Sequence, residues 1–100
     1  MEAKTFKVYQ RTKNEKINQL RKNKEIPCVI YGKSLEQSLL IKIDKSELIR
    51  MLNSKNVNSL ITFRLNRKRL KCLIKEVQKD NNHDILHIDL LCLNKKKVVI

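Results

Sequence analysis

The sequence predicts a mostly β fold, a small and largely antiparallel β-barrel, and three observations lead to it. The chain has 100 residues, which is enough for one domain with one core. Five or six of its segments alternate apolar with polar residues at the period of two that is typical of half-buried strands. Only one segment combines helical spacing with a start signal. An open α+β sheet is the alternative arrangement of the same elements.

The N-terminal third predicts two strands with an exposed excursion between them. Residues 4–10 alternate and form an opening strand. Residues 14–24 contain only two large apolar side chains and support one or two exposed helical turns. Residues 26–31 are nearly all apolar, which is typical of a short strand covered on both sides. Gly32, the only glycine, follows that strand in a turn.

The middle of the chain predicts a strand that leads into a short amphipathic helix. Apolar residues alternate over 39–43, and helical spacing follows over roughly 45–53. Asp44 and Glu47 have the spacing of a capping box, with Asp in the place usually taken by Ser or Thr. We therefore expect these two side chains to cap the helix.

The C-terminal half predicts a hairpin and a last strand. Alternating stretches over 61–65 and 70–74 flank a turn that begins at Asn66 and contains no glycine, although tight hairpin turns favour one. The apolar positions switch from even to odd numbers near Glu76, which predicts a β-bulge or a strand end. The alternation over 86–92 predicts a strand with its even-numbered residues inward.

Positive charge is abundant and unevenly distributed. Lys and Arg number 23 against 10 Asp and Glu, which gives a formal net charge of +13. Residues 4–24 have eight basic side chains and one acid, and residues 64–79 have seven and one, whereas residues 25–63 have five and four. This much charge repels itself in a small domain unless a polyanion neutralises it. The expected partner is a nucleic acid.

The basic side chains of the hairpin have two interpretations. They form either a solvated outer face or a set of contacts to RNA phosphates, which add affinity without sequence choice. They are Arg64, Arg69, Lys71 and Lys75.

Cysteine usage and hydropathy predict a reduced, cytoplasmic protein. Cys28, Cys72 and Cys92 are an odd number for a disulfide framework, and each lies in an apolar stretch, so we expect reduced core residues. Close ligand pairs of the zinc type do not occur, and no metal, cofactor or small-molecule substrate is expected. No apolar run is long enough to cross a membrane, and the first residues lack a secretory signal.

Four short motifs follow one another along the chain. They are Leu20-Arg21, Ile26-Pro27-Cys28-Val29-Ile30-Tyr31-Gly32, Val77-Gln78-Lys79-Asp80 and Leu86-His87-Ile88-Asp89-Leu90. Their order and separations resemble the bacterial large-subunit ribosomal protein family numbered twenty-five, which binds 5S rRNA and includes the general stress protein Ctc. The resemblance runs from Phe6 to Leu90 and corresponds to the short form that has the RNA-binding domain alone.

The resemblance implies a fold, a partner and a place in the cell. We expect a six-stranded, antiparallel-rich β-barrel with two or three short helices over residues 1–94, followed by a basic tail over 95–100 that frays unless it is docked. The implied function is structural and not enzymatic: binding the loop E region of 5S rRNA in the central protuberance, largely from the minor-groove side. Neighbouring large-subunit components are further partners, and the protein is a ribosome-associated cytoplasmic monomer.

The resemblance also implies which residues contact RNA. Arg21, Tyr31, Gln78, His87 and Asp89 fall at the family's RNA-contacting positions, and Lys79 replaces an arginine there. Two arginines of the family pattern are replaced by amide residues in the N-terminal excursion. Nearby basic residues supply charge in their place, and the amides can still hydrogen-bond to phosphate or sugar. The excursion residues in this set are Arg11, Lys13, Lys16, Asn18 and Gln19.

His87 and Asp89 are the centre of the predicted site. Their spacing puts both on one face of a strand, where short polar side chains can read the shallow minor groove of A-form RNA. Spacing alone favours a solvated strand face over a binding role for this pair, and it is the family resemblance that favours binding. We expect both side chains to point outward near the middle of one basic wall of the barrel.

Two other functions remain as alternatives. A small basic ribonuclease could use His83, His87 and Asp89 in acid–base catalysis, although no paired nucleophile or phosphate loop accompanies them. A general RNA-binding β-barrel could bind single strands by stacking, but four aromatic residues leave little for a stacking platform.

Overall fold

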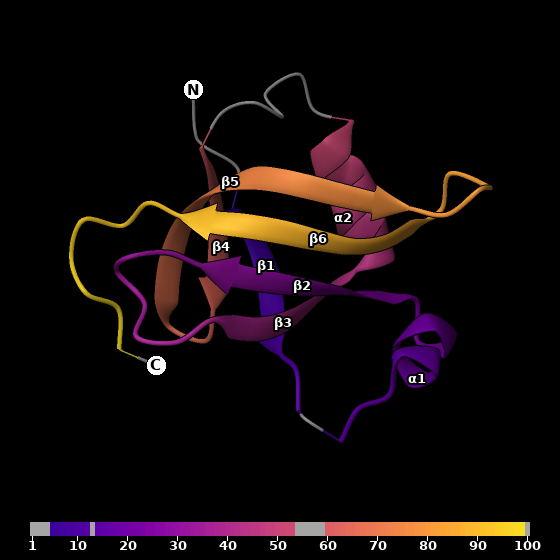
Figure 1. The fold of residues 1–100 in the computed structure, drawn as a ribbon, viewed down its shortest axis with the longest axis horizontal. Coiled ribbons are helices and arrows are strands. Elements are labelled where there is room, and N and C mark those ends of the chain that lie inside the picture. Colours follow the sequence, from indigo (N-terminus) through magenta and orange to yellow (C-terminus); the bar gives the residue numbers. More distant parts are fainter. Residues whose placement is uncertain (1–4, 13, 54–59, 100) are drawn as a thin grey trace.

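The computed structural model describes residues 5–12, 14–53 and 60–99 and shows a closed barrel of six strands with two helices in this part of the chain (Figure 1). The predicted fold class is confirmed, and the open sheet is excluded. The elements are β1 (Thr5–Gln10), α1 (Ile17–Lys22), β2 (Glu25–Tyr31), β3 (Leu39–Asp44), α2 (Lys45–Leu52), β4 (Ile61–Leu65), β5 (Lys68–Lys79) and β6 (Ile85–Cys92).

The strands follow one another around the barrel in the order β1-β3-β2-β6-β5-β4. Four of the six neighbouring pairs are antiparallel, and two, β1 with β4 and β2 with β6, are parallel. The β2–β6 pair therefore lies across the ring from the β1–β4 pair. Closure pairs each of the six described strands with a neighbour on both sides.

Alternation along each strand fills the barrel with apolar side chains. Phe63 on β4 and Phe6 on β1 are buried with their ring centroids 6.5 Å apart, and α2 adds Leu48 and Met51 to the same core. The remaining buried members come from every strand: Val8, Ile26, Cys28, Ile30, Ile41, Ile43, Ile61, Leu65, Leu70, Cys72, Ile88, Leu90 and Cys92. This core fixes which residues of each strand face outward.

The three cysteines are free and buried, as the sequence predicts. Burial raises the pKa of the Cys28 thiol to about 12, and the neighbouring Asp89 carboxylate adds to the shift. Burial also raises the pKa of Cys72, so both thiols stay protonated near neutral pH. They act as core side chains rather than nucleophiles.

The hairpin turn and the bulge follow the sequence pattern. Asn66 has φ 56°, whereas Arg67 stays at negative φ. Asparagine tolerates positive φ better than arginine does, so the turn places this conformation at the residue that suits it. The register between β5 and β6 shifts between Ile74 and Glu76, which confirms the predicted bulge. A second shift follows between Gln78 and Lys79, which the sequence did not indicate.

The prediction that side chains cap α2 is wrong. Asp44 occupies the N-cap position with extended backbone, but its side chain makes no capping hydrogen bond. The first N–H of the helix, that of Lys45, donates instead to the carbonyl of Lys24 at 2.8 Å. The Glu47 carboxylate pairs forward with Arg50 rather than back with the cap.

The C-terminal segment is docked against the loop after β2. Val98 pairs with Leu35 in a parallel bridge, and its N–H donates to the carbonyl of Ser34 at 2.8 Å. The three lysines that precede Val98 are exposed. The segment from 95 to 98 is thus tied to the barrel at its far end.

Candidate nucleic-acid interface

The outer face of β6 presents the predicted polar pair. Ile88 and Leu90 are buried in the core, so the period of two turns His87 and Asp89 outward. Their side chains are 27% and 29% exposed. The outward orientation that the sequence predicts is therefore observed.

The imidazole of His87 lies against the Asp89 carboxylate. Nδ1 of His87 is 3.2 Å from Oδ1 of Asp89, and this nitrogen is buried without an aligned hydrogen bond. The exposed part of the side chain therefore lies away from this nitrogen. A ligand would meet this exposed part, while the Asp89 carboxylate stands beside the buried nitrogen.

Register places further polar side chains beside this pair. Gln78 on β5 lies directly opposite His87, and Glu76 lies opposite Asp89. Gln78 and the adjacent Lys79 are exposed. The structure thus brings four predicted site residues onto two neighbouring strands, with donors and acceptors of both kinds.

Two more predicted residues lie at the ends of this face. Tyr31 is half-buried at the end of β2 and pairs with Leu91 of β6, two residues beyond Asp89. Arg21 of α1 lines a surface hollow together with Asp84 and Leu86, at the start of β6. Both therefore border the face that carries His87, one at each end.

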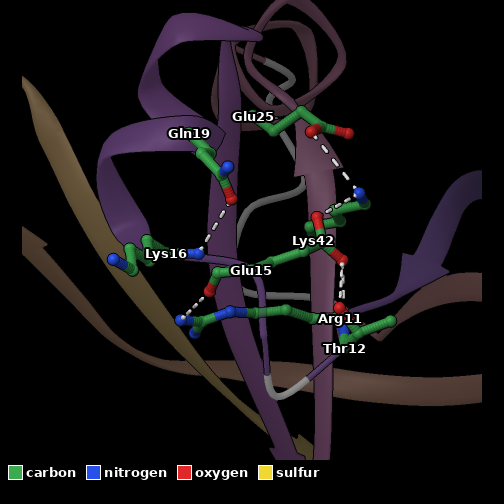
Figure 2. A network of polar contacts seen from close by, with 7 residues as sticks. All are labelled: Arg11, Thr12, Glu15, Lys16, Gln19, Glu25 and Lys42. Atoms are coloured by element: carbon green, nitrogen blue, oxygen red, sulfur yellow. Dashed lines mark hydrogen bonds and ion pairs between the residues drawn. The ribbon is translucent and has the colours of Figure 1, made fainter.

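A polar network ties the N-terminal excursion to the barrel (Figure 2). Nζ of Lys42, on β3, lies 2.6 Å from Oε2 of Glu15 and 3.6 Å from Oε1 of Glu25. Glu15 Oε1 accepts the N–H of Thr12 at 3.0 Å, and its backbone carbonyl accepts from Arg11 Nη2 at 3.3 Å. One lysine therefore holds the excursion against β3 and β2.

The network shifts the pKa values of its two central groups in opposite directions. The hydrogen bond from Lys42 lowers the pKa of Glu15, and the backbone N–H of Thr12 lowers it further. The hydrogen bond to Glu15 raises the pKa of Lys42, and Glu25 adds to this. Both groups are therefore charged over a wide pH range around neutrality.

The predicted residues of the excursion stand on or before α1. Lys16, Asn18, Gln19 and Arg21 are all exposed, while Leu20 is fully buried and anchors the helix. The Gln19 side-chain oxygen accepts the Lys16 N–H at 3.3 Å, so it is already used in starting the helix.

Arg11 and Lys13 differ from these residues. Arg11 is half-buried, and its Nε is buried with no hydrogen-bond partner among the described residues, so only part of its guanidinium faces outward. Lys13 lies outside the described residues.

Sequence reasoning missed the Glu15, Lys42 and Glu25 network. A signal for it was present: Glu15 is the one acid among the eight basic residues of the excursion, and Lys42 is the one charge within an apolar strand. Isolated charges of opposite sign in such surroundings indicate a pair. Their separation of 27 residues hid the contact.

The expectation of a single basic wall around His87 and Asp89 is wrong. Register places Glu76 directly beside Asp89, so this face carries mixed charge. Arg64 and Arg69 instead face each other on β4 and on the part of β5 that pairs with β4. The densest positive charge of the strands therefore lies on β4 and the first part of β5, and not around His87 and Asp89.

The described residues contain neither a metal-binding cluster nor a membrane-spanning helix. Across 5–12, 14–53 and 60–99, no group of three His, Cys, Asp or Glu side chains is placed to hold a metal ion. Neither helix in this part of the chain is long and apolar enough to span a bilayer.

Fold and surface together define the class: a small, strongly basic, closed β-barrel with a polar outer strand face and a charged excursion beside it. The model of the Ribosomal L25p family matches residues 6–90. The chain belongs to the Ribosomal L25p family.

Individual relatives agree with this assignment. The large ribosomal subunit protein bL25 of Listeria monocytogenes is 30% identical over 97% of this chain and 48% of its own length. The bL25 proteins of Natranaerobius thermophilus and Clostridium tetani are 35% and 38% identical, over 99% and 78% of this chain and 48% and 40% of their own lengths. The chain therefore spans about half of the length of these curated relatives, or less than half. All three are named as ribosomal proteins.

Proposed function

We propose that this protein is a structural component of the large ribosomal subunit that binds the loop E region of 5S rRNA in the central protuberance. The observation that carries the proposal is the polar face on which Gln78 lies opposite His87, with Asp89 beside it, in a chain of the L25p family. The face is outward and partly exposed, as a docking surface must be.

The chemistry of this face suits a minor groove. The wide, shallow minor groove of A-form RNA displays 2′-hydroxyls and base edges, which short polar side chains on a rigid strand can reach. Gln78 both donates and accepts, and His87 offers a partly exposed imidazole. Asp89 accepts only, so it fits a guanine amino group or a 2′-hydroxyl but not a phosphate.

The excursion suits the phosphates next to that groove. Lys16 and Arg21 are exposed on or before α1, and Lys79 continues the charge onto β5. The Lys42 network fixes the excursion before RNA arrives, so less ordering is required on binding. Phosphate contacts would add affinity, and the polar face would add discrimination.

The wider setting belongs to the same proposal. The protein acts as a monomer in the cytoplasm, within the ribosome, alongside neighbouring subunit components. We propose no catalysis, because His87 has a carboxylate beside it but no second base opposite it in the register: its neighbour on β5 is Gln78.

Two matched variants test the proposal in a binding titration. His87→Asn removes the imidazole from the polar face, and His83→Asn makes the same change in an exposed loop residue whose positive φ asparagine tolerates. We expect the first to weaken binding of a loop E fragment about tenfold, the cost of about one hydrogen bond, and the second to leave it unchanged.

The same titration separates the alternatives. The proposal predicts tighter binding of 5S rRNA than of an arbitrary RNA duplex of equal length, with the RNA intact after incubation. Equal affinity for both would support the general RNA-binding barrel instead. Cleavage of labelled RNA that disappears in His87→Asn would support the ribonuclease.

A further inference from the structure

A second cationic surface covers the barrel on the side of β1 and β4. Lys7 of β1 pairs with Arg64 of β4, and Arg64 pairs with Arg69 of β5, so three cations stand in one row across three strands. All three side chains face outward and are exposed. Neighbouring strands are about 4.8 Å apart, so the row spans about 10 Å.

More cations extend this row in two directions. Lys71 is the outward neighbour of Arg69 along β5, and it lies opposite Thr62 of β4. Arg67 and Lys68 are exposed at the hairpin turn. We call the six exposed residues the hairpin wall: Lys7, Arg64, Arg67, Lys68, Arg69 and Lys71.

Asn94 brings the C-terminal lysines to the edge of the hairpin wall. Its side chain accepts the Lys71 N–H at 2.9 Å and donates to the Arg69 carbonyl at 3.0 Å. The Leu93 N–H also donates to the Lys71 carbonyl at 2.7 Å. The exposed run 95–97 therefore starts beside the wall rather than at a free end.

The charges of the hairpin wall are not neutralised within the described part of the chain. None of its six residues forms a salt bridge there, whereas Lys42 and Arg50 elsewhere do. The strand segments that carry the wall, β1, β4 and residues 68–75 of β5, contain no acid. Unpaired cations packed this closely repel one another, which an external polyanion would relieve.

The hairpin wall and the polar face are separated around the ring and along β5. Lys7 and Arg64 belong to β1 and β4, which lie across the ring from β2 and β6, whereas Lys68, Arg69 and Lys71 stand at the opposite end of β5 from Gln78. His87 and Asp89 belong to the β2–β6 side, and β1 and β4 pass behind those strands in Figure 1. An RNA helix seated on the polar face would therefore leave Lys7 and Arg64, on the far side of the ring, uncovered.

We propose that the hairpin wall binds the phosphate backbone of a second RNA helix, so that the protein bridges two RNA segments. The wall has cations but few base-reading groups, so the contact adds affinity without sequence choice. Bridging rests on the proposed function for its first RNA, whereas phosphate binding by the wall does not.

A double substitution tests the wall against a control of equal charge. Arg64→Gln with Arg69→Gln removes two wall cations, and Lys33→Gln with Arg50→Gln removes two exposed cations outside it. Lys68→Gln with Lys71→Gln is a second wall variant, in case the first is unstable, and thermal unfolding verifies that each variant is folded. The assay captures a labelled 20-base-pair RNA duplex of arbitrary sequence on protein already bound to an immobilised loop E fragment.

The proposal predicts duplex capture by the parent protein and a loss of about tenfold in both wall variants, with the loop E affinity unchanged. The salt slope of duplex binding should fall by about two, near one per cation removed. The control pair should change neither. Equal losses in wall and control variants, or no loss in either, would overturn the proposal, as would binding of anionic vesicles in preference to RNA.

The two proposals can fail separately. If the protein does not bind the loop E fragment, the proposed function fails. A titration with the duplex alone then still decides whether the wall variants lower affinity and salt slope more than the control does.

Discussion

Glu15 is the residue through which the excursion is held to the barrel. It accepts from Lys42 and from the Thr12 N–H, and these bonds lower its pKa below the ordinary 4.5. A lowered pKa stabilises the folded state above pH 4.5, and this stabilisation is lost as the pH falls through the folded value. The raised pKa of Lys42 acts at the other end, with its contribution lost only above pH 10.5.

Replacing Lys42 should therefore change the titration of Glu15. In Lys42→Met, we expect the Glu15 pKa to rise toward 4.5, staying slightly lower because the Thr12 hydrogen bond remains. Carboxyl-detected NMR titration measures this directly. Lys45→Met is the control, because no described carboxylate pairs with Lys45, and it should leave the Glu15 pKa where it is. An unchanged pKa in Lys42→Met would contradict the network.

Gly32 is required where β2 turns past the end of β6. Its φ is 154°, and a Cβ there would lie 2.5 Å from the Cys92 carbonyl oxygen. A backbone carbonyl cannot yield as a flexible side chain can. We expect Gly32→Ala to lower the free energy of unfolding by about 2 to 4 kcal/mol, measured by urea denaturation. Lys33→Ala, exposed and adjacent, should cost less than about 0.5 kcal/mol, and similar losses in both would contradict this explanation.

Strands were predictable from the sequence because alternation reports which side chains face a core. In β6 it identified His87 and Asp89 as outward, and in β5 the change of parity identified the bulge near Glu76. Both are local properties of the backbone period. The capping box failed because Asp44 and Glu47 satisfy the pattern while Lys24 and Arg50 supply the actual partners.

The N-terminus of α2 should tolerate loss of its N-cap side chain. A capping Asp contributes about 1 kcal/mol, but the Asp44 carboxylate bonds to no helix N–H. We expect Asp44→Ala to change the free energy of unfolding by less than about 0.5 kcal/mol. Leu48→Ala, which empties a fully buried position of the same helix, should cost about 2 to 4 kcal/mol. A loss above 1 kcal/mol in Asp44→Ala would show that the cap acts in solution.

At the scale of the whole molecule, closure of the barrel decides what the site contains. Alternation assigns a residue to a face but does not name the neighbouring strand, so the two parallel pairings could not be predicted from it. They put β2 beside β6 and β1 beside β4. The first pairing gathers Tyr31 near Asp89, and the second places Lys7 beside Arg64.

Charge segregation along the sequence has two different outcomes in three dimensions. The basic excursion stands beside the polar face and is anchored by Glu15 and Lys42. The basic hairpin, formed by β4 and the first part of β5, stands further around the ring, at the opposite end of β5 from Gln78. The sequence predicted a single basic wall, because the distribution of charge along the chain does not show which strands become neighbours when the barrel closes.

The most direct test of the central claim is a map of amide chemical-shift changes on the 15N-labelled protein during titration with one equivalent of a loop E RNA fragment. We predict the largest changes in β6 around His87 and Asp89, in β5 around Gln78, and in α1. Changes concentrated in β1 and β4, with β6 unaffected, would contradict the assignment of the β2–β6 side as the 5S rRNA-binding face.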